Sequence, residues 1–285
     1  MSLFGTYIQE ATSNDNDIVV ISDINESSNE LAYLTGEFMA EAAAFDILVD
    51  IKESVIPAVY NEAATDKIKA IKEKFNTFIQ KAIDFFTDLI DRVKVNALGK
   101  LAKINKDAKI KRKVTLYKVE ADKEYGEFNK LVGNKVSDLI HEAEKFSTED
   151  TDASVAMKLA NDDVKALADK FDDNHFAQYS QQFEVGTSVA QLINFAEKAK
   201  NTVSVNQDSI KLCNNLKKTY EKAAANKDEK FHSTMWYSKN AVELMNKSME
   251  VGRKVNNKVI KNVGAIIVAT GGKENPDKEQ KQIAG

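Results

Sequence analysis

Apolar side chains recur at three- and four-residue steps along most of this chain, which is the spacing of amphipathic α-helices. The pattern is densest in KFNTFIQKAIDFFTDLIDRVK, residues 74–94, where one apolar row follows the spacing of a heptad seam. A second apolar row lies beside it. Together the rows include Ile68, Ile71, Phe75, Phe78, Ile79, Phe85, Phe86, Leu89 and Ile90. This 68–93 apolar face is wide enough to predict a helix packed against two or more neighbours in a bundle.

Three partners are open for the 68–93 apolar face: the protein's own core, a seam with another subunit, or a membrane. A helix lying in a membrane surface has a polar face rich in Lys or Arg. The polar face here carries both signs, with Asp84, Asp88, Asp91, Lys74, Lys81 and Arg92. Anionic lipid is therefore a poor partner, and the pattern favours a bundle core, followed by a subunit seam.

The remaining elements are also predicted to be helices. Ser27 and Glu30 have the spacing of a capping box, so a first helix should begin there and run to about Val55, before Pro57. A second should run from about Thr65 to between Asn96 and Gly99. The basic segment after it keeps helical periodicity to Tyr117, and a helix then continues to Phe146. Further helices are predicted at about 153–172, 187–202, 206–225 and 232–269.

The chain contains only two prolines and 11 glycines, few for the turns of an all-β or α/β fold. The predicted fold is therefore all-α, an elongated multi-helix bundle. Residues 1–26 should form a short extended arm, in which DIVVISDI is β-branched. Residues 27–146 form a first helical region, and 147–270 a second that is either separate or continuous with it. Residues 271–285 have the composition of a solvated tail.

Charge is strongly segregated along the chain. Residues 1–63 contain twelve acidic residues and one basic residue, whereas Gly99–Lys118 contains eight basic residues and one acidic residue. Such alternation favours contacts between segments of opposite sign, within one chain or between copies. The basic stretch predicts contact with DNA or with an acidic partner. Its candidate residues are Lys106, Lys109, Lys111, Arg112 and Lys113, with Lys106, Lys109 and Lys113 on one face of the predicted helix.

No constellation of catalytic, cofactor-binding or metal-binding residues is predicted. His141, His175 and His232 have no second histidine or cysteine at metal-ligand spacing, and the glycines lack the phosphate-loop pattern. The single cysteine, Cys213, cannot form an internal disulfide. The first residues do not have the composition of a secretory signal, and no apolar run is long enough to span a membrane. These features predict a soluble protein made and kept in a cytoplasm.

The order of segments supplies a resemblance. A polar leader precedes GEFMAEAAAFDILVDIKES, then KIKAIKEKFNTFIQKAIDFFTDLIDRVK and a lysine-rich continuation. Over about residues 30–115 this resembles the helical structural and head-interior proteins of large tailed bacteriophages. The resemblance implies a non-enzymatic, capsid-associated or head-interior virion component, made in the host bacterial cytoplasm and present in many copies. It also implies self-association and contact with other virion proteins, and it supplies no catalytic residues.

The expected function is accordingly that of a structural or assembly protein which acts through helix packing and segregated charge. Three alternatives stay open. One is a membrane-active helical protein, such as an ejected pore component or a haemolysin-like toxin, although no stable membrane insertion is expected. The second is a DNA-associated virion protein. The third is a helical-bundle enzyme with clustered carboxylates.

Overall fold

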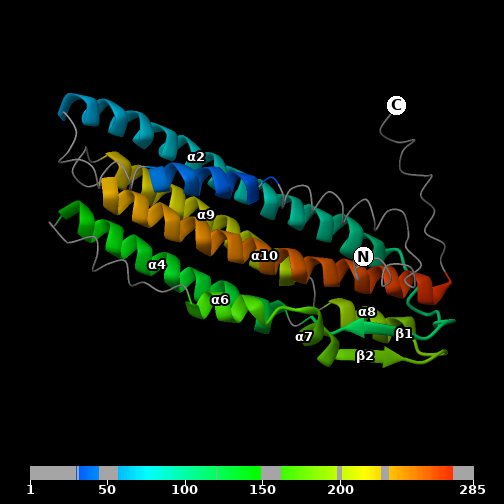
Figure 1. Cartoon of the computed structure of the whole chain (residues 1–285). Helices are drawn as coiled ribbons and strands as arrows, with labels where there is room; N and C mark the ends of the chain where they lie inside the picture. The colour runs from blue at the N-terminus through cyan, green and yellow to red at the C-terminus, as the bar shows by residue number, and fades with distance from the viewer. Residues whose placement is uncertain are drawn as a thin grey trace, which may run out of the picture.

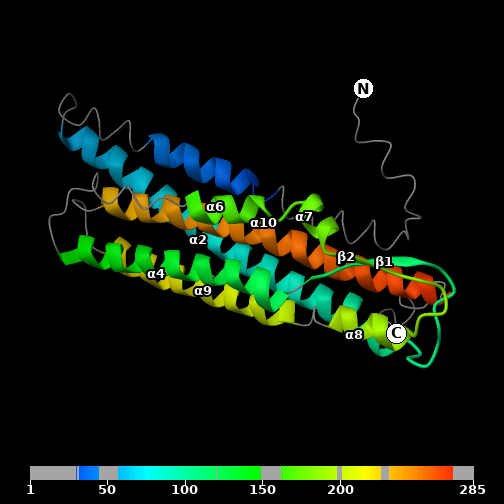
Figure 2. The same cartoon turned by 90° about the horizontal axis from the view of Figure 1, so that it is seen from below.

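Four long helices form the centre of the molecule in the computed structural model (Figures 1 and 2): α2 (Pro57–Arg92), α4 (Gly126–Thr148), α9 (Asn201–Ala225) and α10 (Phe231–Thr270). Both α2 and α4 pack against α9 and α10, and α9 also contacts α10. At 40 residues, α10 is about 60 Å long and passes along the whole bundle. Helices from both halves of the sequence therefore line one hydrophobic core.

The structure describes residues 30, 32–44, 57–119, 121–148, 162–197, 201–225 and 231–271. Helix accounts for 83% of the interpretable residues, so the predicted all-α fold is confirmed. The predicted N-terminal arm lies outside the described residues. The same is true of the predicted C-terminal tail, apart from Gly271, and of most of the predicted boundary after Phe146.

The 68–93 apolar face points into the core. Of its predicted residues, Ile68 is half-buried and packs against the core, whereas Ile71, Phe75, Phe78, Ile79, Phe85, Phe86, Leu89 and Ile90 are buried. The Phe75 ring is 4.1 Å from the Tyr220 ring of α9 and 6.3 Å from Phe38, between ring centroids. The face is wide because α2 has neighbours on several sides.

The helix α2 begins at Pro57, earlier than the predicted start near Thr65. Proline is well tolerated in the first turn, where its missing N–H has no helical acceptor to lose. The chain continues from α2 through a π-helical turn, η2 (Val93–Gly99), and one short turn, α3 (Lys100–Ala102). Residues 45–56, where the predicted first helix should end, lie outside the described residues.

The helical prediction for the basic segment is wrong. Residues 103–113 are irregular, and Val114–Tyr117 forms strand β1, paired antiparallel with β2 (Ser180–Phe183). Asn105 accepts a 3.0 Å bond from the Asp107 N–H, a local turn that competes with helix. In β1, Val114 and Leu116 are buried and Thr115 is exposed, which is the two-residue period of a strand.

The other elements agree with the prediction to different degrees. The chain enters α4 through η3 (Ala121–Tyr125), and α10 nearly coincides with the predicted 232–269. Helix forms at α6 (Asp162–Asp169) within the predicted 153–172 and at α8 (Val189–Glu197) within the predicted 187–202, whose last two residues belong to α9. The predicted helix at 206–225 begins earlier, as α9. The short helix α7 (Asp173–Gln178) and strand β2 were not predicted.

A polar layer crosses the centre of the bundle. The Tyr125 hydroxyl donates to Asn206 Oδ1 (2.7 Å), and the Asn206 amide donates to Asn256 Oδ1 (3.2 Å). The Asn256 amide donates in turn to the Gly252 carbonyl (2.6 Å). A Cβ at Gly252 would come within 2.9 Å of the Tyr125 hydroxyl oxygen, so glycine lets the tyrosine approach the α10 backbone. The layer joins η3, α9 and α10 in one arrangement.

Residues 32–44 form a further helix, called here the N-terminal helix, which lies along the outside of α2 and α10 (Figure 1). Phe38 and Ala42 are the residues that its described part buries fully. Thr35 exchanges hydrogen bonds with Asn246 of α10.

Candidate functional site

The predicted basic residues lie in the segment between α3 and β1, at the end of the molecule where the small sheet and the end of α10 meet (Figure 1). The surface formed by residues 103–113 is called here the basic end. Its cationic side chains are all exposed: Lys103, Lys106, Lys109, Lys111, Arg112 and Lys113. The structure does not place Lys106, Lys109 and Lys113 on one helix face, because no helix forms there.

Main-chain hydrogen bonds fasten the basic end to its surroundings. Ile110 donates to the Thr187 carbonyl (3.0 Å) and accepts from the Gly186 N–H (3.0 Å). The Lys111 N–H donates to the Ala269 carbonyl (2.7 Å) near the end of α10. Ile110 itself is 2% exposed. The backbone of this segment is therefore held in a fixed position, with cationic side chains before and after the buried Ile110.

Two of these cations lie beside a group of negative charge or negative partial charge. Lys113 lies 3.0 Å from Glu184, but both side chains are more than half exposed, so the pair contributes about 0–1 kcal/mol. The Lys111 side chain passes over Gly271, which has φ +80° and follows the last residue of α10. A lysine beside the negative end of a helix is stabilising.

The other four cations have no such partner. Among the described residues, no carboxylate lies within ion-pair distance of Lys103, Lys106, Lys109 or Arg112. Because Gly99–Lys118 carries +7 and the whole chain −4, the rest of the chain carries −11. The basic end is thus a concentrated positive surface on an acidic protein.

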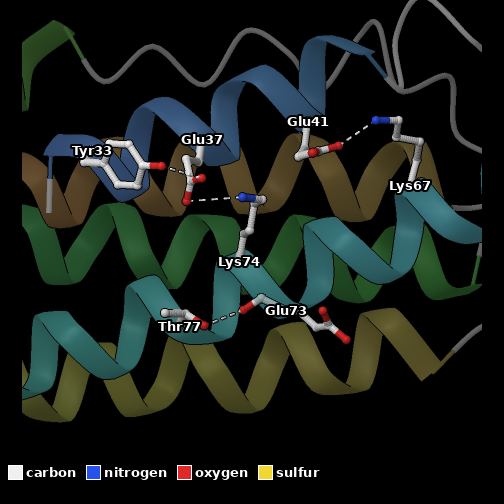
Figure 3. Close-up of polar contacts among 7 residues, drawn as sticks. All are labelled: Tyr33, Glu37, Glu41, Lys67, Glu73, Lys74 and Thr77. Carbon is white, nitrogen blue, oxygen red and sulfur yellow. Dashed lines mark hydrogen bonds and ion pairs between the residues drawn. The ribbon is translucent and has the colours of Figure 1, made fainter. Parts of the chain in front are cut away.

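The acidic N-terminal helix pairs with α2, not with the basic end. Glu41, Glu37 and Glu30 lie 2.8, 3.2 and 2.8 Å from Lys67, Lys74 and Lys81 respectively. Figure 3 shows the first two pairs crossing between the helices. These three pairs, called here the ion-pair ladder, fix an antiparallel arrangement, because lower numbers on one helix meet higher numbers on the other. The seven-residue spacing of the lysines was a sequence signal for this contact, and the sequence interpretation missed it.

One rung of the ion-pair ladder includes a tyrosine. The Tyr33 hydroxyl donates to Glu37 Oε1 at 3.0 Å (Figure 3). This donor, together with Lys74, lowers the pKa of the Glu37 carboxyl. The same carboxylate raises the pKa of Tyr33. The charged form of Glu37 is therefore the one that the contact favours.

A cavity of about 320 Å³ lies beneath the N-terminal helix. It is lined by Ala32, Thr35, Phe85, Asn246, Met249, Glu250 and Arg253. Burial raises the pKa of Glu250, but Lys254 and Lys247 outweigh that effect and keep its pKa below the usual value. The Glu250 carboxylate therefore interacts with these two lysines of α10.

Lys258 and Asn262 of α10 hold the small sheet. The Lys258 ammonium lies 4.2 Å from the centroid of the Tyr117 ring and 5.4 Å from that of Phe176, although this lysine is buried. Asn262 donates to the Tyr117 carbonyl and accepts from its N–H, at 2.7 and 2.8 Å. Its amide therefore bonds to β1 as a neighbouring strand would. Nothing in the local sequence distinguishes these two residues from surface positions.

The titratable side chains buried in the core pack there in their neutral form. Burial raises the pKa of the Cys213 thiol to about 12, and it also raises the pKa of Tyr125, Tyr220 and Tyr237. All four are therefore neutral near pH 7. His141 is exposed. Across the described residues, no three His, Cys, Asp or Glu side chains are grouped so that they could hold a metal ion.

Comparison with known proteins gives no relationship: no family model matches the chain, and neither a curated protein nor a solved structure is significantly similar to it. In the ranges that the structure describes, no helix combines the length and the apolar character needed to cross a membrane.

Proposed function

We propose that this chain is a non-enzymatic structural or assembly protein that associates with itself and with other proteins through charged surfaces. The observation that supports this most directly is the basic end, where four exposed cations on a fixed backbone have no carboxylate partner among the described residues. A fixed array of like charges binds a surface of opposite charge with defined geometry and at an increased rate.

The proposed mechanism separates folding from association. The apolar faces of α2, α4, α9 and α10 are used inside the chain, where they form one core. Charged surfaces then remain for contacts with partners. An acidic surface on a neighbouring copy is a suitable partner, since the chain outside Gly99–Lys118 carries −11. The rigid bundle would hold the basic end at a constant distance from such acidic surfaces.

The proposed setting is a bacteriophage virion, with the chain as a capsid-associated or head-interior component present in many copies. This part rests on the resemblance of residues 30–115 to helical virion proteins. The basic end also favours a second candidate, contact with packaged DNA, because several phosphates could be neutralised there.

Sedimentation and particle analysis test the proposal. At low salt we expect the purified chain to sediment as a species larger than its 31.7 kDa monomer, and to dissociate as salt screens the charges. Quantitative mass spectrometry of particles from producing cells should find many copies per particle. A chain that stays monomeric at all concentrations and is absent from particles would contradict the proposal.

A further inference from the structure

The strand β2 has one edge that no other strand pairs with. Among the described residues the sheet consists of β1 and β2 alone, and Figure 1 shows β2 at the lower margin of the molecule. The opposite edge of the sheet is different, because the Asn262 side chain bonds there to both main-chain groups of Tyr117. One edge of the sheet is therefore closed by α10, and the other is open in the part of the chain that the structure describes.

The hydrogen-bond pattern of the sheet determines which main-chain groups of β2 point to the open edge. The Lys118 N–H donates to the Tyr179 carbonyl at 3.0 Å, in register with the pairing of β1 and β2. In an antiparallel ladder every second residue of a strand bonds to its neighbour, so the odd-numbered residues of 179–183 bond toward β1. The main-chain groups of Ser180 and Gln182 therefore point outward, away from β1.

The open edge lacks the features that usually keep edge strands from pairing. Natural edge strands carry lysine or proline, or are interrupted by a bulge. The sequence of β2 is SQQF, its pairing with β1 is continuous, and its first three side chains are exposed but uncharged. Between Asp173 and Glu197, Glu184 is the only Asp, Glu, Lys or Arg, although 29% of the whole chain is charged. The edge is thus suited to pairing with another strand.

Two exposed apolar side chains flank β2. Tyr179 directly precedes the strand and is 45% exposed, and Val185 follows it closely and is 59% exposed. Large apolar side chains with this much exposure are few among the described residues. The two-residue period of a strand places Tyr179 and Val185 on the same face of the sheet. An apolar contact is therefore available at each end of the open edge.

A second copy of β2 complements this edge. If two β2 strands meet antiparallel about a two-fold axis at Gln182, the two Gln182 residues lie opposite each other and exchange their main-chain hydrogen bonds. In this register Ser180 lies opposite Glu184, whose N–H can donate to the Ser180 carbonyl; the Glu184 carbonyl is already used in the turn that follows β2. Tyr179 lies opposite Val185, and an aromatic side chain opposite a β-branched one is a favourable cross-strand pair.

We propose that two copies of this chain associate through the open edges of β2, antiparallel about Gln182, so that their two small sheets become one continuous sheet. This contact goes beyond the charged contacts proposed above, because it uses an uncharged edge and is separate from the basic end. Its few main-chain hydrogen bonds make a small interface, so the contact is weak between isolated copies. In an assembly of many copies it adds to the charged contacts, since neighbouring chains are held at high effective concentration.

Disulfide trapping in the full chain tests the contact and its register. Gln182→Cys should form a disulfide-linked dimer severalfold faster than Gln181→Cys, because Cβ atoms of directly opposite residues lie close to disulfide distance and those of diagonal residues do not. The native Cys213 does not compete, since it is buried and its thiol pKa is raised to about 12. At 1 M salt, where the Debye length is about 3 Å, the basic end does not contribute. Equal trapping of the two variants, or trapping no faster than for Gln80→Cys at an exposed position of α2, would overturn the proposal.

Amide hydrogen exchange at 1 M salt gives an independent readout with a control inside the strand. The amides of Gln181 and Phe183 bond to β1 and should be protected at every protein concentration. The Gln182 amide should exchange severalfold more slowly as the protein concentration rises. Exchange of Gln182 that does not depend on concentration would overturn the proposal. If Gln182 were protected only in assembled particles, a strand of a different protein would be the occupant, and the proposal would again be wrong.

A charge at the two-fold axis supplies the matched variant. Gln182→Lys places like charges directly opposite each other, so the concentration dependence of exchange at the Glu184 amide should disappear. Gln80→Lys adds the same charge to α2 and should keep that dependence. A dependence that survives in Gln182→Lys would contradict pairing through β2. Because these measurements are made in high salt, their failure leaves the charged contacts of the proposed function untouched, and absence of the chain from particles would refute that function without affecting β2.

Discussion

The N-terminal helix and the central bundle are both helical, but different forces hold them. In α2, Phe75, Phe78 and Ile79 are completely buried, and α9 and α10 cover them from two sides. In the N-terminal helix the fully buried side chains of the described part are Phe38 and Ala42, and the remaining attachment is mainly the ion-pair ladder. Complete burial of one large apolar side chain contributes about 1.5–3 kcal/mol, whereas an exposed ion pair contributes about 0–1 kcal/mol.

This difference implies two levels of stability in one chain. The bundle should unfold as a single cooperative unit, because its helices share one core. The N-terminal helix should open at a lower free energy, since few apolar contacts are lost when it leaves. Substitutions in the two regions should therefore change different observables.

The largest effect is expected from charge in the core of the bundle. Replacement of Phe78 and Phe85 by aspartate places two unpaired carboxylates in buried positions and should abolish the folded state. Phe78→Ala alone should lower the free energy of unfolding by about 3–5 kcal/mol, measured by denaturant titration with circular dichroism. Val95→Asp is the control, because Val95 is 60% exposed. A double variant that remained soluble and fully helical would contradict this account of α2.

A glycine-to-alanine substitution should change stability in opposite directions in the two regions. At Gly252 a Cβ would meet the Tyr125 hydroxyl oxygen at 2.9 Å and a Phe86 ring carbon at 3.2 Å, so Gly252→Ala should destabilise the bundle by about 1–3 kcal/mol. At Gly36 nothing lies within 4 Å. Gly36→Ala should therefore stabilise the N-terminal helix by about 0.5–1 kcal/mol, through higher helix propensity. Amide hydrogen exchange resolves both changes. A stabilised bundle in Gly252→Ala would show that the polar layer is looser than described.

Phe38→Ala should release the N-terminal helix without unfolding the bundle. The substitution removes the packing of Phe38 on Phe75 and leaves mainly half-exposed ion pairs. We expect amides of residues 32–44 to lose protection from exchange while those of α9 keep theirs. If the midpoint of global unfolding fell as far as in Phe78→Ala, the distinction between the two regions would be wrong.

The smallest effect is expected from acid. The pKa of Glu37 is lower in the folded state than its usual value of 4.5, so its contact stabilises the folded form above that value. The contribution is lost as the pH falls through the folded-state pKa. Amide chemical shifts of residues 32–44 should therefore change below about pH 4.5, before those of the bundle. Glu37→Gln should remove part of this pH dependence; an identical titration in that variant would exclude Glu37 as its cause.

The sequence predicted the bundle better than the basic end for a physical reason. In α2 the apolar residues repeat at helical spacing over many turns, and burial of that face decides the local structure. Around Ile110 the lysines also recur at helical spacing, but there the backbone bonds to Thr187, Gly186 and Ala269 decide the structure. Those partners are distant in sequence, so local periodicity carried no information about them.

The buried polar contacts could not be predicted from the sequence for a related reason. Asn206, Asn256 and Asn262 have the residue type of a solvated helix face, and their burial depends on how α9 and α10 meet the other elements. The cations of the basic end are exposed, but the helix face assigned to three of them does not exist, and their contact with DNA or an acidic partner stays a prediction. Composition was sufficient to find the charge, whereas its geometry required the tertiary structure.

The spacing of the ion-pair ladder has a consequence for how the N-terminal helix finds its place. If that helix slipped seven residues along α2, Glu30 would meet Lys74 and Glu37 would meet Lys67, so repeated charges alone would accept the wrong alignment. Phe38 would not fit the wrong alignment, because the slip would take it away from Phe75. The charges therefore attract the N-terminal helix to α2, and the single aromatic ring of Phe38 determines its register along α2.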